Sequence, residues 1–441
     1  MALSIALSVR RLKHELRCFL TPEMITPAAA ELGLTWKNTP LAVPNVVACF
    51  ARQILGGNIS MPELARLSGS RFTPEAYCLA RSRLPVLVLR ALLGKLITLC
   101  PQASAAAPAW KGHRLWHMDG SFFSMPDTPE LQHHFGQPGQ QRQGCGFPVA
   151  HLLCLFDAAT GLIRDCVISP LRTHDLTQAG KVHGSLARGD IVIADRAFES
   201  YAHLALMQEK GVHVILPVHQ RRKVDFVRRE SRSGKNGRHL QRQRVRRQGT
   251  CDQVADWHKP ESKPTWMSQE QFDRLSSTIR VREIKRTVRL ASGRRQVIVL
   301  VTTLLDPDRY PAEELVGVLK DRWQVEVNLR HLKTTMKMDI LRSQSVAGIE
   351  KELWMFLIVY NLVRLVMLEA AQAQAKPVQR ISFADALHWL RHGNLDDALP
   401  RLRLIPDHPG RLEPRVVKRR STKYRLLTKP RSIMQKALRA A

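Results

Sequence analysis

Apolar residues in the first part of the chain, residues 1–108, recur mostly at helical spacing, and the segment closes in a loose run of Pro, Gln, Ala and Ser. Ser60 and Thr73 are each followed within two residues by a proline, which is typical of helix starts. A tight link that contains Gly69 joins the two expected helices. The pattern resembles a helix-turn-helix, although any helical hairpin that packs on its neighbours gives it too.

The pattern changes to short strands after the N-terminal segment. Residues 114–119 alternate between apolar and polar as a strand does, and the turn at 157–161 separates two more strand candidates. The expected elements are, in order, strands at 114–119, 149–156 and 162–169, a helix at 175–187, a strand at 189–195, a helix at 201–210 and a strand at 212–218. Three strands followed by helix, strand, helix and strand is the order of a ribonuclease-H-like core.

A basic insertion interrupts this core. Residues 221–247 contain twelve Lys or Arg against two acids, so we expect a mobile loop or hairpin tip that is too charged to be core. Strand candidates at 278–285 and 296–303 make the rest of the insertion largely β. Pro311 then begins a long helix that carries Glu326.

Helical patterns return after this helix, at 353–370 and 383–392. The most apolar run, residues 353–368, contains Asn361 and Arg364, so it predicts a buried helix and not a membrane span. The tail from Arg411 onward holds eleven basic residues and one acid. We therefore predict a multidomain α/β fold. Its parts are a helical N-terminal domain (1–108), the core in two pieces (109–218 and 306–345), the β-rich insertion (219–305) and a helical C-terminal region with a basic tail (346–441).

Charge narrows the choice of partner. The formal net charge is +30 and the pI is near 10.6, which favours a polyanion such as nucleic acid. The N-terminus mixes apolar and basic residues as an amphipathic helix does, and it is not a secretory signal. We expect DNA contacts from the helix-turn-helix region, the insertion and the tail. The expected contact residues there are Tyr77, Arg81, Arg83, Arg221, Arg222, Lys223, Lys418, Arg419 and Arg420.

The eight cysteines are scattered without a C-x-x-C pair. This spacing argues against both a zinc site and a disulfide framework, and it indicates a reducing compartment. We therefore expect a cytoplasmic protein with no membrane partner.

One short stretch carries the strongest candidate chemistry. On a helix with about 100° per residue, Arg322, Glu326 and Lys333 fall within about 40° of one another. An acid between two bases on a narrow stripe suits a metal ion held by the carboxylate and a phosphate held by the cations. The alternative is an ordinary solvated face with ion pairs along the helix.

Two strand-end acids complete the candidate site. Asp119 ends the first expected strand and Asp195 ends the fourth, and these strands are neighbours in a ribonuclease-H-like sheet. Together with Glu326 they suit two divalent cations about 3.5–4 Å apart, the arrangement used for phosphoryl transfer. We expect Mg²⁺, with Mn²⁺ able to replace it. Each aspartate taken alone has a simpler reading as a turn or helix cap.

These motifs resemble those of bacterial insertion-sequence transposases of the DDE type, in the IS-four family with its Tyr-x2-Arg-x3-Glu-x6-Lys signature. The matching residues are Arg322-x3-Glu326-x6-Lys333, Asp119-Gly120-Ser121 and Asp195-Arg196-Ala197-Phe198, with Tyr360-Asn361-Leu362-Val363-Arg364 on a later helix. The resemblance covers about residues 110 to 435. Two positions depart from it: Leu319 stands at the tyrosine, and Ala197 at a glycine. Leu319 lies one helical turn before Arg322, so we expect its side chain to line the same groove in which the tyrosine would lie.

The resemblance implies a cut-and-paste reaction on double-stranded DNA, by a homodimer that pairs the two element ends. Asp119, Asp195 and Glu326 would hold the metal ions, and Arg322, Lys333 and Arg196 would grip phosphates. Relatives form a hairpin at the cut end, a step that Leu319 puts in question because it lacks the hydroxyl. Trp257 or Trp266 would stack on a flipped base, although a core role is the simpler reading for either. We assign His117 a structural role.

Two other readings stay open. The first is a ribonuclease-H-like nuclease that cuts particular DNA structures without strand transfer. The second is a catalytically silent DNA-binding regulator derived from a transposase. All three acids are present, which argues against the silent form.

Overall fold

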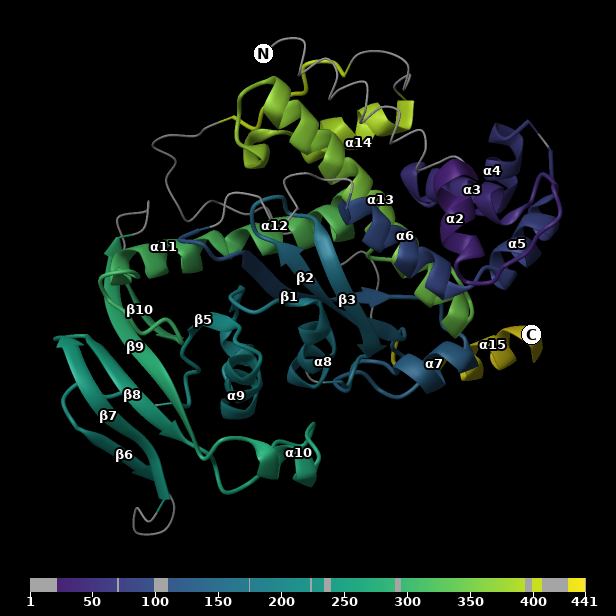
Figure 1. Cartoon of the computed structure of the whole chain (residues 1–441). Coiled ribbons are helices and arrows are strands. Elements are labelled where there is room, and N and C mark those ends of the chain that lie inside the picture. The colour runs from purple at the N-terminus through teal and green to yellow at the C-terminus, as the bar shows by residue number, and fades with distance from the viewer. Residues whose placement is uncertain are drawn as a thin grey trace.

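The computed structural model describes residues 22–440, apart from 70, 99–109, 174, 223, 234–238, 290–294, 393–398 and 407–426. Within these residues one mixed sheet of ten strands runs through the molecule, in the order β3-β2-β1-β4-β5-β10-β9-β8-β7-β6 (Figure 1). The strands are β1 (Leu115–Ser124), β2 (Val149–Asp157), β3 (Ile163–Pro170), β4 (Ile191–Ala194), β5 (His213–Pro217), β6 (Glu230–Ser233), β7 (His239–Gly249), β8 (Asp252–His258), β9 (Thr278–Arg289) and β10 (Arg295–Thr302).

The first five strands position the candidate acids. Strand β1 pairs with β2 in antiparallel and with β4 in parallel orientation, and β4 continues in parallel to β5. The last pair between β1 and β4 joins Met118 to Ala194. Asp119 and Asp195 each follow this last pair by one residue, so they lie level on adjacent strands. The expectation that Asp119 ends its strand is wrong, because pairing with β2 continues β1 to Ser124. The predicted adjacency of the first and fourth strands is confirmed.

The insertion extends the same sheet. Strand β10 pairs with β5, and the strands back to β6 follow in antiparallel order, which confirms the two strands expected at 278–285 and 296–303. The expectation that residues 221–247 are too charged for core is wrong for Arg242. Its side chain on β7 is 2% exposed and pairs at 2.7 Å with Glu283 on β9, which is fully buried. The buried carboxylate makes this buried guanidinium tolerable.

Helices cover both faces of the sheet (Figure 1). Helices α11 (Ala312–Asp321) and α12 (Trp323–Arg330) cross one face, and α8 (Asp175–Val182) and α9 (Tyr201–Glu209) cover the other. A π-helical turn, His331–Thr335, follows α12. The remaining helices are α2 (Pro22–Ala30), α3 (Val43–Leu55), α4 (Met61–Leu67), α5 (Pro74–Arg83), α6 (Val86–Thr98), α7 (Pro129–Phe135), α10 (Gln269–Arg274), α13 (Val346–Ala373), α14 (Phe383–His392) and α15 (Arg431–Ala440).

Helix α13 is the centre of the helical part. It contacts α3, α6 and α14, so the N-terminal and C-terminal helices share one hydrophobic core with one face of β1–β3. Among the described helices it is the one long and apolar enough to cross a membrane, and most of its apolar stretch is buried inside the protein. The prediction of a buried helix in this region is confirmed.

The polar residues of α13 hold the turn between β2 and β3 and the start of β3. The amide of Asn361 donates to the carbonyl of Ile163 and accepts from its N–H, both at 2.9 Å. The hydroxyl of Tyr360 donates to the carbonyl of Gly161 at 3.0 Å, and Arg364 donates to the same turn. Because this turn joins β2 to β3, the Tyr-Asn-x-x-Arg motif fixes the sheet beside the strand that carries the first acid.

Candidate active site and DNA-binding residues

An arginine lies between two of the candidate acids. Nη1 of Arg322 is 3.3 Å from Oδ2 of Asp119, and its Nη2 is 2.8 Å from Oε1 of Glu326. Arg322 stands at the junction of α11 and α12, and the packing of α12 on β1 places its guanidinium beside that strand. The structure therefore brings Asp119, Arg322 and Glu326 together, as the sequence predicts.

The third acid, Asp195, lies at the end of β4 beside this group. Its Oδ1 accepts from the N–H of Ala197 at 2.7 Å, so it also caps the short helix that follows. Asp195 thus has the capping role that was the simpler reading for a strand-end aspartate. A cap uses one carboxylate oxygen and leaves the other available to a ligand.

Burial raises the pKa of Asp119 to about 6. The N–H of Gly120 and the guanidinium of Arg322 act against this shift, and the charges of Asp195 and Glu326 add to it. Asp195 and Glu326 therefore both act to raise the pKa of Asp119, less strongly than its burial does. One arginine does not neutralise three carboxylates, so the group retains an excess of negative charge.

The donor atoms suit a hard divalent cation, which prefers carboxylate oxygens. Within the described residues, however, no three His, Cys, Asp or Glu side chains stand close enough to enclose a metal ion. The guanidinium of Arg322 takes up the space between Asp119 and Glu326. The residues fit a metal site in kind, and Arg322 has to move before the acids can close on an ion.

Lys333 reaches the same strand from the π-helical turn. Its Nζ is 3.5 Å from the hydroxyl of Ser121 and 5.7 Å from the centre of the Phe123 ring. Ser121 and Phe123 lie on the same face of β1 as Asp119, because strand residues two apart share a face. The π-helical turn changes the helix phase after α12 and brings the lysine back over the strand.

His117 lies on this face as well, two residues before Asp119. It is 2% exposed, and its Nε2 has no hydrogen-bond partner in the part of the chain that the structure describes. Burial and the nearby Arg322 lower the pKa of His117 to about 4. Its ring is thus uncharged near neutral pH.

Leu319 does not line the groove beside Arg322. It is 7% exposed and belongs to the hydrophobic core that α11 forms with β4, β5 and β10. The expectation that it points where the family tyrosine would point, derived from continuous helical spacing, is wrong. The side of α11 that carries Leu319 packs on the sheet, which keeps this side chain away from the acid cluster.

We therefore predict that Leu319→Tyr destabilises the protein. The larger ring overpacks a closed core, which costs about 1–3 kcal/mol, whereas Leu319→Met costs less than about 1.5 kcal/mol. Chemical denaturation of the two variants and the parent chain measures the difference. A tyrosine variant as stable as the parent would show that the side chain has room to leave the core.

Two of the N-terminal contact residues face inward. The helix starts at Ser60 and Thr73 are confirmed by their side-chain caps. Tyr77, however, is fully buried and donates to Gln53 at 3.1 Å, and Arg81 donates to Gln53 at 3.1 Å and to Ser343 at 3.0 Å.

Tyr77 and Arg81 thus fasten α5 to α3 and to the segment before α13, and the expectation that they reach DNA is wrong. Arg83 is exposed, and its role in binding DNA stays a prediction.

The expected DNA contacts in the core, the insertion and the tail also include both paired and exposed residues. Arg222 is bound to Glu199 at 2.5 Å and lies 3.8 Å from the ring centre of Trp257, so its expected role as a free DNA contact is wrong. Arg196 and Arg221 are exposed. The expected contacts Lys223, Lys418, Arg419 and Arg420 lie outside the described residues.

Trp257 is core, as the simpler reading held. It is fully buried and its ring N–H donates to Glu283 at 2.8 Å, so it is unavailable for stacking on a base. Trp266 packs against the same core and is partly buried.

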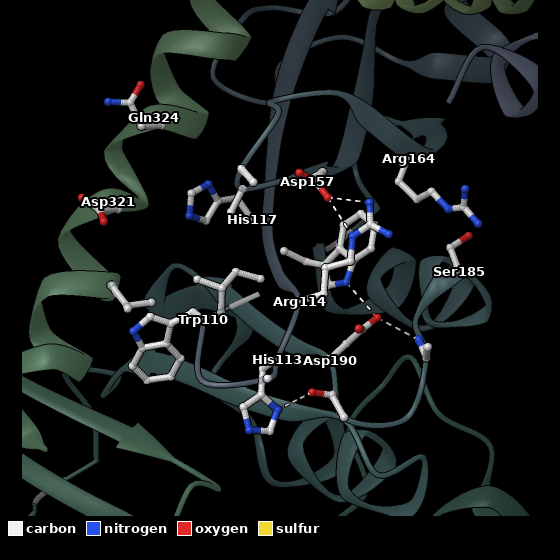
Figure 2. Close-up of a pocket in the computed structure, with 18 of the residues that line it drawn as sticks. Trp110, His113, Arg114, His117, Asp157, Arg164, Ser185, Asp190, Asp321 and Gln324 are labelled. Carbon is white, nitrogen blue, oxygen red and sulfur yellow. Dashed lines mark hydrogen bonds and ion pairs between the residues drawn. The ribbon is translucent and has the colours of Figure 1, made fainter. Parts of the chain in front are cut away.

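Residues that the sequence analysis did not single out line a cavity of about 650 Å³ next to the acid cluster (Figure 2). The hydrophobic pattern of any single strand or helix does not predict this cavity, because its walls come from five separate segments.

Comparison with known proteins supports the motif assignment. The chain matches the model of the transposase DDE domain over residues 110–362. It is 23% identical over 448 residues to "Transposase InsG for insertion sequence element IS4" of Escherichia coli (strain K12), which covers 95% of this chain and 94% of that protein. It is also 29% identical over 112 residues to "Putative transposase InsZ" of the same strain, covering 24% and 37% of the two chains.

Among solved structures, the cryo-EM structure of the piggyBac transposase synaptic complex with hairpin DNA aligns with a TM-score of 0.45 at 11% identity, covering 85% of this chain and 78% of that chain. The family match spans more than half of this chain and includes all three candidate acids. The resemblance seen in the Arg-x3-Glu-x6-Lys and Asp-Gly-Ser motifs is confirmed. The chain belongs to the DDE transposases, in the family of the IS4 insertion-sequence enzymes.

Proposed function

We propose that this transposase cuts its element free and joins it to target DNA with Asp119, Asp195 and Glu326 as the catalytic acids. The observation that carries the proposal is the convergence of these residues. Asp119 in the middle of β1 and Asp195 directly after β4 stand level on neighbouring parallel strands, each one residue past the pair of Met118 and Ala194. Glu326 is joined to Asp119 through Arg322. Three carboxylates from separate segments in one environment are costly for stability and useful for phosphoryl transfer.

DDE transposases generally use divalent metal ions. We infer that Asp119, Asp195 and Glu326 hold two Mg²⁺ ions, which Mn²⁺ would replace. When bound, such ions activate the attacking oxygen and stabilise the leaving oxygen. The carboxylates of this chain supply the ligands, and they are partly exposed, with 19% of the Asp119 side chain and 37% of the Glu326 side chain accessible to solvent.

Arg322 connects DNA binding to the acids. In the DNA-free chain it neutralises Asp119 and Glu326, so the acids remain compact despite their charge. A DNA phosphate next to the cut bond offers the guanidinium a bidentate partner of the same kind. We propose that Arg322 turns from the acids to this phosphate, and that Lys333 and exposed Arg196 bind neighbouring phosphates.

The rest of the assignment follows the same division of the chain. We propose that residues 109–218 and 306–345 form a ribonuclease-H-like core and that 219–305 are the insertion. Residues 1–108 would bind the element ends, and 346–441 would buttress the core and add a basic tail. The partner is double-stranded DNA, the end-paired complex is a homodimer, and the protein acts in the bacterial cytoplasm. If a hairpin intermediate forms, Leu319 cannot donate a hydrogen bond to it, because leucine lacks a hydroxyl.

A strand-transfer assay tests this function. We expect the purified chain with Mg²⁺ to cut DNA that carries the element's terminal inverted repeats and to insert the freed 3′ ends into a supercoiled plasmid. The matched control is the same DNA with scrambled repeats, which should be neither cut nor joined. Cutting without any plasmid insertion would favour the nuclease reading, and specific binding without cutting would favour the silent regulator.

A further inference from the structure

A buried hydrogen-bond network joins the N-terminal helices to the strand that carries Asp119. Its centre is Glu352 on α13, which is 1% exposed and forms no ion pair with a residue that the structure describes. One carboxylate oxygen accepts from Asn58 at 2.7 Å and from the N–H of Arg342 at 2.9 Å, and the other accepts from the N–H of Ser343 at 2.8 Å. Three donors therefore take the place of the cation that pairs with most buried charges.

A second bond enters the same network from α5. Arg81 donates to the hydroxyl of Ser343 at 3.0 Å and to the side chain of Gln53 at 3.1 Å. Gln53 in turn donates to the carbonyl of Ile59 at 2.9 Å, just before α4 begins. Polar bonds therefore tie both helices of the expected helix-turn-helix to residues 342–343.

Residues 338–343, which we call the linking segment, carry this network to the acid cluster. The segment forms a parallel bridge with the end of β1, where Ile340 pairs with Ser124. The N–H of Ser124 donates to the carbonyl of Asp339 at 3.2 Å, and the N–H of Asp339 donates to the carbonyl of Lys333 at 3.2 Å. The linking segment thus holds both the far end of β1 and the turn that carries Lys333.

The network lies between two parts of the chain with different proposed roles. Helices α4 and α5 pack on α3 at one side of the molecule, and α3 packs on α13 (Figure 1). The packing of α3 and α6 on α13 is apolar and has no preferred direction, so it holds these helices without selecting one position for them. Buried hydrogen bonds are directional, and a satisfied network specifies one arrangement. The position of α4 and α5 relative to the acids therefore depends on the network around Glu352.

We propose that this network sets which phosphodiester bond is cut, because it fixes the distance from the DNA end held by α4 and α5 to the acids. The inference rests on the proposed function, since it needs end binding by the N-terminal region and cutting by the acids. In an end-paired homodimer it holds whether a chain cuts the end that it binds or the end bound by its partner, because both chains carry the same network. Asn58, Ser343 and Glu352 are positioning residues that act through the linking segment.

The experiment maps cut positions to the nucleotide, with the full-length protein, Mg²⁺ and end-labelled DNA that carries the element's terminal inverted repeat. Asn58→Gly removes a side-chain donor and suits the left-handed backbone at this position, where φ is 58°. Ser343→Ala removes the hydroxyl that accepts from Arg81. The two variants are tested singly and combined, and they leave the acids, Arg322 and Lys333 unchanged.

The parent chain should cut at one position. In the combined variant, we expect the share of cuts at other positions to rise about tenfold or more, with smaller rises in the single variants, because bonds that select the arrangement are lost. Binding of the DNA end, followed by gel shift, should change little, since both substituted side chains are buried away from DNA.

Two controls separate the cut position from stability. Ser82→Ala removes a hydroxyl from the same helix, α5, which bonds to the carbonyl of Leu79 outside the network. Leu92→Ala opens a cavity under α6 in the shared core, so it lowers stability without changing a residue of the network. Both controls should cut at the parental position.

Scattered cuts in the combined variant, with single cuts in both controls, would support the proposal. Cuts at the parental position in a folded combined variant would overturn it. Equal scatter in Leu92→Ala would overturn it too, because the effect would then follow from stability alone. If a thermal melt shows that the combined variant does not fold, the single variants carry the same test. A parent chain that binds the end without cutting would overturn the proposed function, and this inference with it.

Discussion

Replacing Asp119, Asp195 or Glu326 with alanine should lower the rate of DNA-end cleavage by about 10³-fold or more, which corresponds to about 4 kcal/mol of transition-state stabilisation. The physical reason is that each carboxylate supplies ligand oxygens at a site where charge develops on two DNA oxygens. Binding of the DNA ends should change little, because the grip on the phosphates is spread over many cations. The measurement is single-turnover cleavage of end-labelled DNA, with binding followed by gel shift.

Asp339→Asn is a matched control, since Asp339 is exposed and follows the same helical segment without joining the acid cluster. It should cleave at the parental rate. If any one of the three alanine variants retained more than about a tenth of that rate, its residue would not be a metal ligand. A variant that lost binding and cleavage together would point to unfolding instead, which a thermal melt would reveal.

The parts of the fold that could be predicted from sequence are those set by local chemistry and strand order. Ser60 and Thr73 cap their helices because a hydroxyl before a proline-containing first turn is favourable in nearly any context. The adjacency of β1 and β4 follows from the alternation of strands and helices, which allows few topologies. Asp119 and Asp195 could therefore be brought together without coordinates.

Features that depend on distant partners could not be predicted. Arg81 binds Ser343, 262 positions along the chain, and no local pattern shows that this helix face turns inward. Leu319 was placed from helical spacing alone, and that spacing does not show that this side of α11 packs on β4, β5 and β10. The pair of Arg322 with Glu326 follows from i,i+4 spacing, whereas its contact with Asp119, 203 positions earlier, depends on how α12 packs on β1.

The insertion shows the same limit most clearly. Twelve cations between residues 221 and 247 predict that this segment is exposed to solvent. That prediction fails for Arg242, whose side chain is buried in an ion pair. Its partner Glu283 lies two strands away, on the far side of β8. Glu283 accepts from Arg242, Gln253 and Trp257, so one carboxylate organises the buried polar centre of the insertion.

Glu283→Ala should therefore destabilise the protein by about 3–5 kcal/mol, because it leaves the charge of Arg242 and the ring N–H of Trp257 buried without a partner. Glu283→Gln keeps a neutral acceptor for Trp257 and should lose less. The matched control is Glu313→Ala on the surface pair of Glu313 with Arg286, at 2.9 Å with the glutamate side chain 74% exposed, which should change stability by no more than about 1 kcal/mol.

Denaturant unfolding followed by tryptophan fluorescence measures these differences, since Trp257 itself reports on the buried centre. A second variant separates the charge from the packing. Arg242→Met combined with Glu283→Met removes both charges and fills the space with apolar atoms, so it should lose less stability than Glu283→Met alone. If the double variant were the less stable of the two, burying Arg242 without its partner would carry no penalty, which would contradict this account. A double variant less stable than the parent chain would show that the buried pair is a net source of stability for the insertion.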